Sequence, residues 1–218
     1  MLHYIQALLG QLNFSSALDA ALRAASILLC LTVHETCHGL AALSLGDPTA
    51  KELHRLSFNP LRHIDWLGLA MMFTVGFGWA KPVPVDPRYF KNPKRGMALT
   101  ALAGPLSNFA LALALLFISR WIYLYTDYTP LWDGIFNFLH TTAILSIGLG
   151  LFNLLPIPPL DGSKVLGALL PDKAYFTLMH YERYGMLLLF LLSFANVGGG
   201  LIGRGIYAVY TTMVNLIY

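Results

Sequence analysis

Two histidines four residues apart lie in a run of the chain that is predominantly apolar. His34 and His38 flank Glu35 in the motif His-Glu-Thr-Cys-His, within residues 24–45. On a helix, side chains four positions apart lie one turn above each other on the same face, so both imidazoles can reach one metal ion while the glutamate lies beside them. The pattern is typical of zinc hydrolases.

The apolar surroundings strengthen this interpretation. Ionisable groups inside a membrane-length helix are costly, and they indicate function when a partner can be named. Zinc would be that partner for His34 and His38. The structural alternative, a solvated helix face, is difficult to sustain within so apolar a run.

A catalytic zinc takes three protein ligands and leaves one position for water, so a third ligand is needed. We predict that it is Asp161, which follows an apolar stretch in the run from Asn153 to Gly162. Three prolines and Gly162 in this run would let the chain turn inward and bring the carboxylate to the histidines.

The composition indicates a polytopic membrane protein. Of 218 residues, 56% are apolar and only 11% are charged, whereas soluble domains have about 25% charged residues. The net charge of +3 is mild and suggests no nucleic-acid partner. We expect an all-α fold in which residues 1–218 form a single membrane-embedded domain, with a core over about 17–175 and additional C-terminal membrane helices over 176–218.

Hydropathy predicts a bundle of about four to six membrane helices. The first core helix is expected over residues 17–45, and the later spans over 97–123, 134–155 and 175–196. Residues 1–14 have the periodicity of a helix that lies on the bilayer surface or begins the next helix. The tail over 201–218 is either a further span or an interfacial helix.

The segment over residues 46–96 determines the expected topology. It contains eight of the 14 lysines and arginines, and the positive-inside rule places such a segment in the cytoplasm. The metal motif would then lie toward the cytoplasmic side. Within the segment, residues 68–80 are apolar but shorter than the roughly 20 residues of a spanning helix. We expect a small re-entrant β element there, containing Gly76 and Gly78, between the first and second core helices.

Three motifs follow one another along residues 30–165. They are His34-Glu35-x-x-His38, Gly104-x-x-x-Asn108, and the run Asn153-x-x-Pro-x-Pro-x-Leu-Asp161-Gly162. Together they resemble the site-2 protease family (peptidase family M50) of intramembrane zinc metalloproteases, in the short form without PDZ or CBS domains. One small departure is Trp66, which stands where a proline would be expected.

The resemblance implies one zinc ion per chain, bound by His34, His38 and Asp161. It implies that Glu35 takes the proton of a water molecule and passes it to the leaving amine. The substrate would be a transmembrane segment of another protein, cut within the lipid bilayer, most simply that of a prokaryotic cell membrane.

The resemblance also gives two asparagines a role at the substrate. Asn108 and Asn153 would hold the substrate backbone or stabilise the oxyanion, which a side-chain amide can do as a donor. We further predict that an unwound substrate pairs with residues 68–85 by strand addition, with Gly76 and Gly78 in contact with it. For Asn108 the structural alternative is an interhelical hydrogen bond, which is common in membrane bundles.

Other functions share parts of this pattern. Two histidines and a carboxylate also form the facial triad of non-haem iron enzymes, so an iron membrane oxidase is one alternative. A zinc transporter would need ionisable residues along several spans, whereas these cluster at one depth. A catalytically silent protein that binds transmembrane segments is a third alternative, disfavoured because Glu35 and all three candidate ligands are present. The sequence names neither the substrate nor the oligomeric state.

Overall fold

The computed structural model describes residues 17–68, 71, 79–127, 129–194 and 199–218. These residues form helices and irregular segments, and no β-strand occurs among them. Two short 3₁₀ turns, η1 (Pro60–Arg62) and η2 (Pro87–Tyr89), accompany the α-helices. The α-helices are α2 (Ala17–Ser44), α3 (Thr49–Glu52), α5 (Pro93–Tyr125), α6 (Pro130–Asn153), α7 (Asp161–Leu169), α8 (Asp172–His180), α9 (Glu182–Phe194) and α10 (Gly199–Ile217).

Three of these helices, α2, α5 and α6, are long and apolar enough to cross a membrane. They contain 28, 33 and 24 residues, and about 20 suffice for a bilayer core of about 30 Å. The chain is therefore a multi-pass membrane protein, and the larger count of four to six spans stays a prediction. The expected span over 175–196 is divided into α8 and the 13-residue α9, with Tyr181 at the junction.

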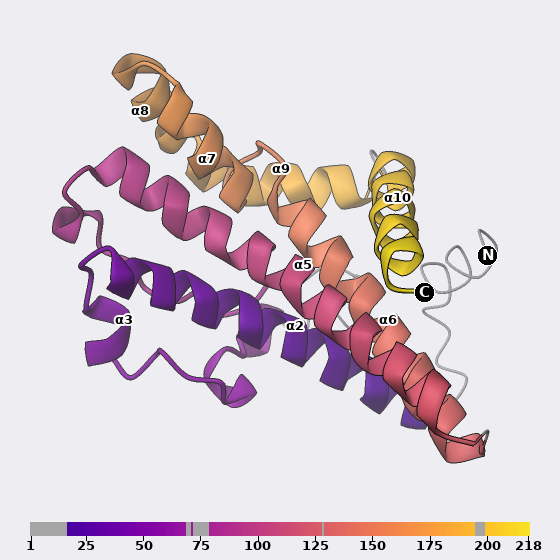
Figure 1. Ribbon diagram of the computed structural model, residues 1–218. Helices are drawn as coiled ribbons and strands as arrows, with labels where there is room; N and C mark the ends of the chain where they lie inside the picture. The colour runs from indigo at the N-terminus through magenta and orange to yellow at the C-terminus, as the bar shows by residue number, and fades with distance from the viewer. Residues whose placement is uncertain (1–16, 69–70, 72–78, 128, 195–198) are drawn as a thin grey trace.

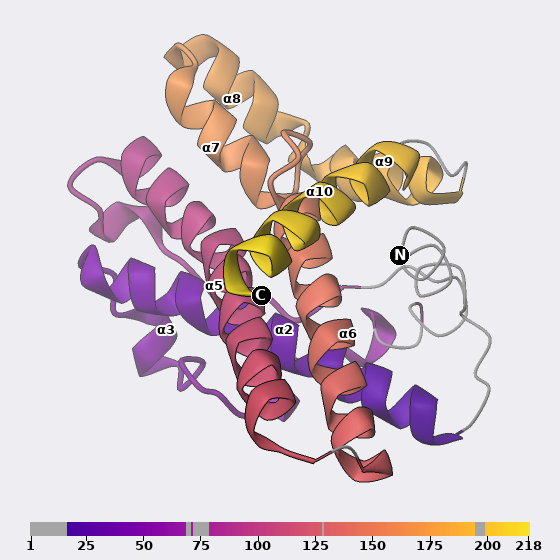
Figure 2. The same cartoon turned by 45° about the vertical axis from the view of Figure 1, so that its right-hand side comes forward.

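The three long helices pack against one another, and α10 crosses α5 and α6 (Figures 1 and 2). The apolar core lies where these last three helices meet, and Leu116, Ile147 and Ile206 are buried in it. Helix α7 lies against α5. This contact brings the start of α7 close to the C-terminal half of α2.

Residues 79–86 form an irregular segment without strand pairing. It runs beside α2, because the backbone N–H of Val83 donates to Glu35. Most of residues 68–80, where the β element was expected, lie outside the described residues, as do Gly76 and Gly78, so this element stays a prediction. The prolines of the segment 79–86 explain why it does not form a ladder, since proline lacks the backbone donor that a ladder requires.

Candidate metal centre

His34, His38 and Asp161 meet between α2 and the first residue of α7. The Nε2 atoms of the two histidines lie 3.1 and 3.2 Å from Oδ2 of Asp161 and 3.0 Å from each other. All three side chains are buried. The structure thus brings together the three residues that the sequence suggested as ligands, from positions more than 120 residues apart in the chain.

The other nitrogen of each imidazole is also held. Nδ1 of His38 lies 2.7 Å from the carbonyl oxygen of Thr100, which can only accept a hydrogen bond. Nδ1 of His38 therefore carries the hydrogen, and its Nε2 presents a lone pair to the cluster. A histidine that binds a metal through one nitrogen commonly donates to a carbonyl or carboxylate through the other.

His34 has a similar contact with Asn108 of α5. The amide nitrogen of Asn108 lies 3.1 Å from Nδ1 of His34, and the amide oxygen is buried without a hydrogen-bond partner among the described residues. Exchanging the amide oxygen and nitrogen by a half-turn would let Nδ1 of His34 donate to the oxygen. Nε2 of His34 would then also present a lone pair, as a metal ligand must.

This arrangement fits a zinc ion. Two imidazole lone pairs and an anionic oxygen converge, and Oδ2 of Asp161 is buried without a hydrogen-bond donor among the described residues. Ligand atoms about 2.1 Å from a tetrahedral zinc lie about 3.4 Å apart, which is close to the observed separations.

Gly104 of α5 gives the two imidazoles their space. A Cβ atom at this position would lie 2.5 Å from both Cε1 and Nε2 of His38 and 2.7 Å from Cε1 of His34. Any larger residue would displace the rings, because real Cβ atoms do not approach other atoms so closely. The glycine of the Gly104-x-x-x-Asn108 motif is thus explained by packing against the metal centre.

Glu35 faces a cavity of about 330 Å³ beside the cluster. Its Oε2 accepts a hydrogen bond of 2.8 Å from the backbone N–H of Val83, which orients the carboxylate. The cavity is also lined by His34, His38 and Asp161. A general base and the candidate metal ligands therefore share one chamber in which water and a peptide bond could meet.

The two asparagines lie in different places. Asn153, at the end of α6, lines the cavity, and its amide nitrogen donates to the carbonyl of Leu149. Asn108 is fully buried against His34 and is absent from the cavity wall. This geometry favours substrate contact for Asn153 and support of a histidine for Asn108.

Asp47 was not among the residues that the sequence suggested for the site. It is completely buried just beyond the end of α2. Its Oδ1 accepts from the backbone N–H and the hydroxyl of Thr49, and its Oδ2 accepts from the backbone N–H of Asp86 at 2.7 Å. Glu35 and Asp47 therefore hold the two ends of residues 83–86 against α2.

Membrane-length helices around a His-His-Asp cluster with an adjacent glutamate define the class of membrane metalloproteases. The chain belongs to peptidase family M50, whose model matches residues 122–192. Over 175 residues it is 35% identical to "Putative zinc metalloprotease YwhC" of Bacillus subtilis. The matched region covers 79% of this chain and 80% of the relative.

Further relatives come from bacteria and archaea. The chain is 31% identical over 181 residues to "Putative zinc metalloprotease Rip2" of Mycobacterium tuberculosis, covering 79% of this chain and 66% of the relative. It is 36% identical over 83 residues to "Zinc metalloprotease MJ0392" of Methanocaldococcus jannaschii, covering 38% and 22%. No solved structure matches. The predictions of a zinc cofactor and of metalloprotease activity are confirmed by this family membership.

Proposed function

We propose that this zinc metalloprotease cuts peptide bonds within transmembrane segments of other membrane proteins. The observation that carries the proposal is the position of the cluster inside membrane-length helices. His34 and His38 lie within the candidate span Leu18–Ser44, and α5, a second candidate span, contacts both imidazoles through Thr100 and Asn108. A site within membrane-length helices is most directly accessible to a substrate that is itself embedded in the membrane.

His34, His38 and Asp161 would hold one zinc ion, which supplies Lewis acidity that polarises a carbonyl and lowers the pKa of water to about 7. Glu35 takes a proton from the attacking water and transfers it to the nitrogen of the leaving amine. The hydrogen bond from Val83 keeps one carboxylate oxygen in place, so the other is available for this transfer. Asn153 contacts the substrate backbone, and Asn108 fixes the orientation of His34.

The substrate must be unwound locally, because helical peptide bonds are shielded by their own hydrogen bonds. Residues two apart in an extended chain present their N–H and C=O to the same edge. Val83 donates its N–H to Glu35, and Val83 and Val85 both line the cavity; if the segment is extended here, the backbone of Val85 faces the same edge.

Among the described residues, no hydrogen-bond partner is recorded for the backbone of Val85. We therefore place substrate pairing at Val85. Val85→Pro, which removes the N–H, should lower the cleavage rate and leave the zinc content unchanged. Unchanged cleavage would refute pairing at this residue.

The cytoplasmic orientation is also part of the proposal. Arg55 donates to the carbonyls of Lys81 and Pro82, and Pro82 lines the catalytic cavity. The cavity therefore lies next to the basic segment that the positive-inside rule places in the cytoplasm. A reporter fused after residue 86 should be active only in its cytoplasmic form, and activity on the outer side would reverse the topology.

Purified protein in detergent tests the function. Zinc per chain and cleavage of a model transmembrane substrate should be measured for the wild type, His38→Ala, Asp161→Asn and Glu35→Gln. We expect about one zinc per chain, weakened in the ligand variants, and retained zinc without cleavage in Glu35→Gln. Cleavage that survives Glu35→Gln would overturn the mechanism.

A further inference from the structure

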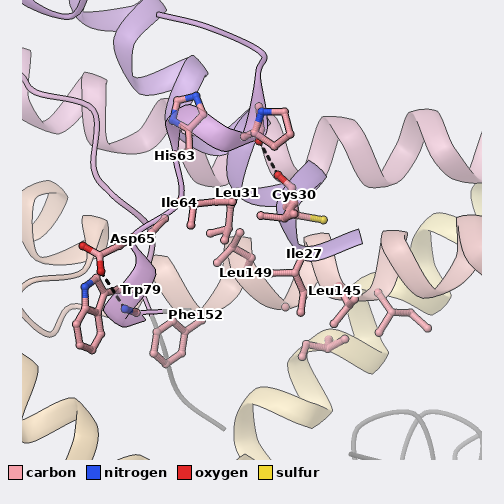
Figure 3. A pocket seen from close by; sticks show the side chains of 18 of the residues that line it. Ile27, Cys30, Leu31, His63, Ile64, Asp65, Trp79, Leu145, Leu149 and Phe152 are labelled. Carbon is pink, nitrogen blue, oxygen red and sulfur yellow. Dashed lines mark hydrogen bonds between the residues drawn. The ribbon is translucent and has the colours of Figure 1, made fainter. Parts of the chain in front are cut away.

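A second cavity, of about 390 Å³, lies between α2, α6, α10 and the irregular segments around residues 60–68 and 79–80 (Figure 3). It is larger than the catalytic cavity, and most of its lining is apolar. The labelled side chains Leu31, Leu149 and Phe152 come from α2 and α6. The proposed reaction uses none of these side chains.

The second cavity follows the catalytic cavity along the same three elements. On each element, a residue that lines the apolar cavity shares a face with a residue that lines the catalytic cavity. The pairs are Leu31 and Glu35 on α2, Leu149 and Asn153 on α6, and Ala80 and Pro82 in the irregular segment. Helical residues four apart share a face, and so do alternate residues of an extended chain. The paired lining residues on α2 and on α6 are therefore about one helical turn, or about 5.4 Å, apart, so the two cavities are neighbours.

The apolar cavity lies on the bilayer side of the metal centre. On α2, its lining residues precede His34 and so lie farther from the C-terminal end of the candidate span, although residues from 60–68 and 79–80, which also line the cavity, belong to the basic segment. A transmembrane substrate that places one peptide bond at the metal keeps its remaining membrane-embedded residues on this side. Those residues carry the large apolar side chains that such a cavity can enclose.

We propose that the apolar cavity is a specificity subsite, which encloses a large apolar side chain of the substrate, such as leucine or phenylalanine, next to the bond that is cut. This inference rests on the proposed function. Lipid tails are as apolar as leucine, so burial alone gives no preference within a bilayer. The preference comes from filling the cavity, because an empty one forfeits dispersion contacts with its lining atoms.

Gly148 of α6 offers a way to fill the cavity. It lines the cavity, and a Cβ atom there would meet only the Ile206 side chain, with Cδ1 at 3.3 Å and Cγ1 at 3.9 Å. The variant is Gly148→Leu. Its matched control on the same helix is Gly134→Leu, because no atom of the described residues lies within 4 Å of a Cβ built at Gly134. Leu145→Ala enlarges the cavity and serves as the opposite change.

The readout is kcat/KM for a series of transmembrane substrates that carry alanine, leucine or phenylalanine at each position near the cut, with zinc content measured alongside. At one position, the wild type and Gly134→Leu should cut the leucine or phenylalanine substrate about tenfold faster than the alanine substrate, as one hydrophobic pocket can discriminate. Gly148→Leu should lose or reverse this preference at that position only. Leu145→Ala should shift it toward phenylalanine.

Two results would overturn the subsite. One is an unchanged preference at every position in both cavity variants. The other is an equal loss for all substrates in Gly148→Leu, which would assign the cavity to a lipid chain or to helix packing. Failure of the proposed function gives a different result, because the wild type would then cut no transmembrane substrate at all.

Discussion

At the scale of single residues, the metal centre depends on contacts that orient its ligands. The carbonyl of Thr100 fixes His38, and the amide of Asn108 lies against His34. Both contacts come from α5, which also provides Gly104. The ligands can be recognised from their side-chain types. They can bind a metal only when the facing residues of α5 orient the imidazoles and leave space for them.

Gly104→Ala should remove zinc from the protein. The added Cβ would lie 2.5 Å from His38 and 2.7 Å from His34, so the imidazoles must leave their positions. We expect zinc content to fall severalfold and cleavage to fall with it. Gly134→Ala, at an open position on α6, should behave as the wild type. Full zinc content in Gly104→Ala would contradict the packing argument.

Asn108→Leu should weaken zinc binding by about 10- to 100-fold, as loss of a partner that orients a ligand usually does. Competition with a chelator measures this affinity. An asparagine that served only the oxyanion would leave zinc affinity unchanged and lower kcat. That pattern would restore the substrate role that the sequence suggested for Asn108.

At the scale of elements, the segment that lines the catalytic cavity has little regular structure of its own. Residues 83–86 are held by two carboxylates, Glu35 within α2 and Asp47 just beyond it. The positive φ of Gly46, 103°, turns the chain so that Asp47 can reach this segment. The end of α2 and the cavity wall are thus one structural unit.

Asp47→Ala should lower the free energy of unfolding by about 1–3 kcal/mol, because the partly buried N–H groups of Thr49 and Asp86 lose their acceptor. The cavity wall would lose its position, so we expect KM for a transmembrane substrate to rise while zinc content stays the same. Asp127→Ala, at an exposed position, is the control. Wild-type KM in Asp47→Ala would contradict the positioning role.

The helices themselves were largely predictable. Apolar runs placed the three long helices to within about four residues, and the starts of two could have been placed better. Asn92 and Thr129 cap α5 and α6 with proline at the first helical turn, a known start signal. The division into α8 and α9 occurs where His180 and Glu182 interrupt the apolar pattern.

The site was predictable where its residues are chemically distinctive. The histidine spacing is local, and Asp161 was the acid that directly follows an apolar stretch and the turn-forming prolines. The carbonyl of Thr100 and the N–H of Val83 could not be found in this way, because every residue has a backbone. The burial of Asp47 depends on contacts with residues 39 positions away, which no local pattern encodes.

At the scale of the whole molecule, the described part of the chain combines a polar chamber beside the metal centre with a larger, neighbouring apolar cavity. In the proposed function, the chamber holds the residues that activate water, and the apolar cavity takes a side chain from the membrane-embedded part of the substrate. Both are built on α2 and α6 with the same irregular segment between them.

The most direct test of this account is to map the cut bond in a transmembrane substrate in lipid vesicles. Mass spectrometry of the products should place the new ends within the apolar segment for the wild type, with no such products from Glu35→Gln. Product ends that lie only in loops outside the bilayer would contradict the proposal that this protease acts within the membrane.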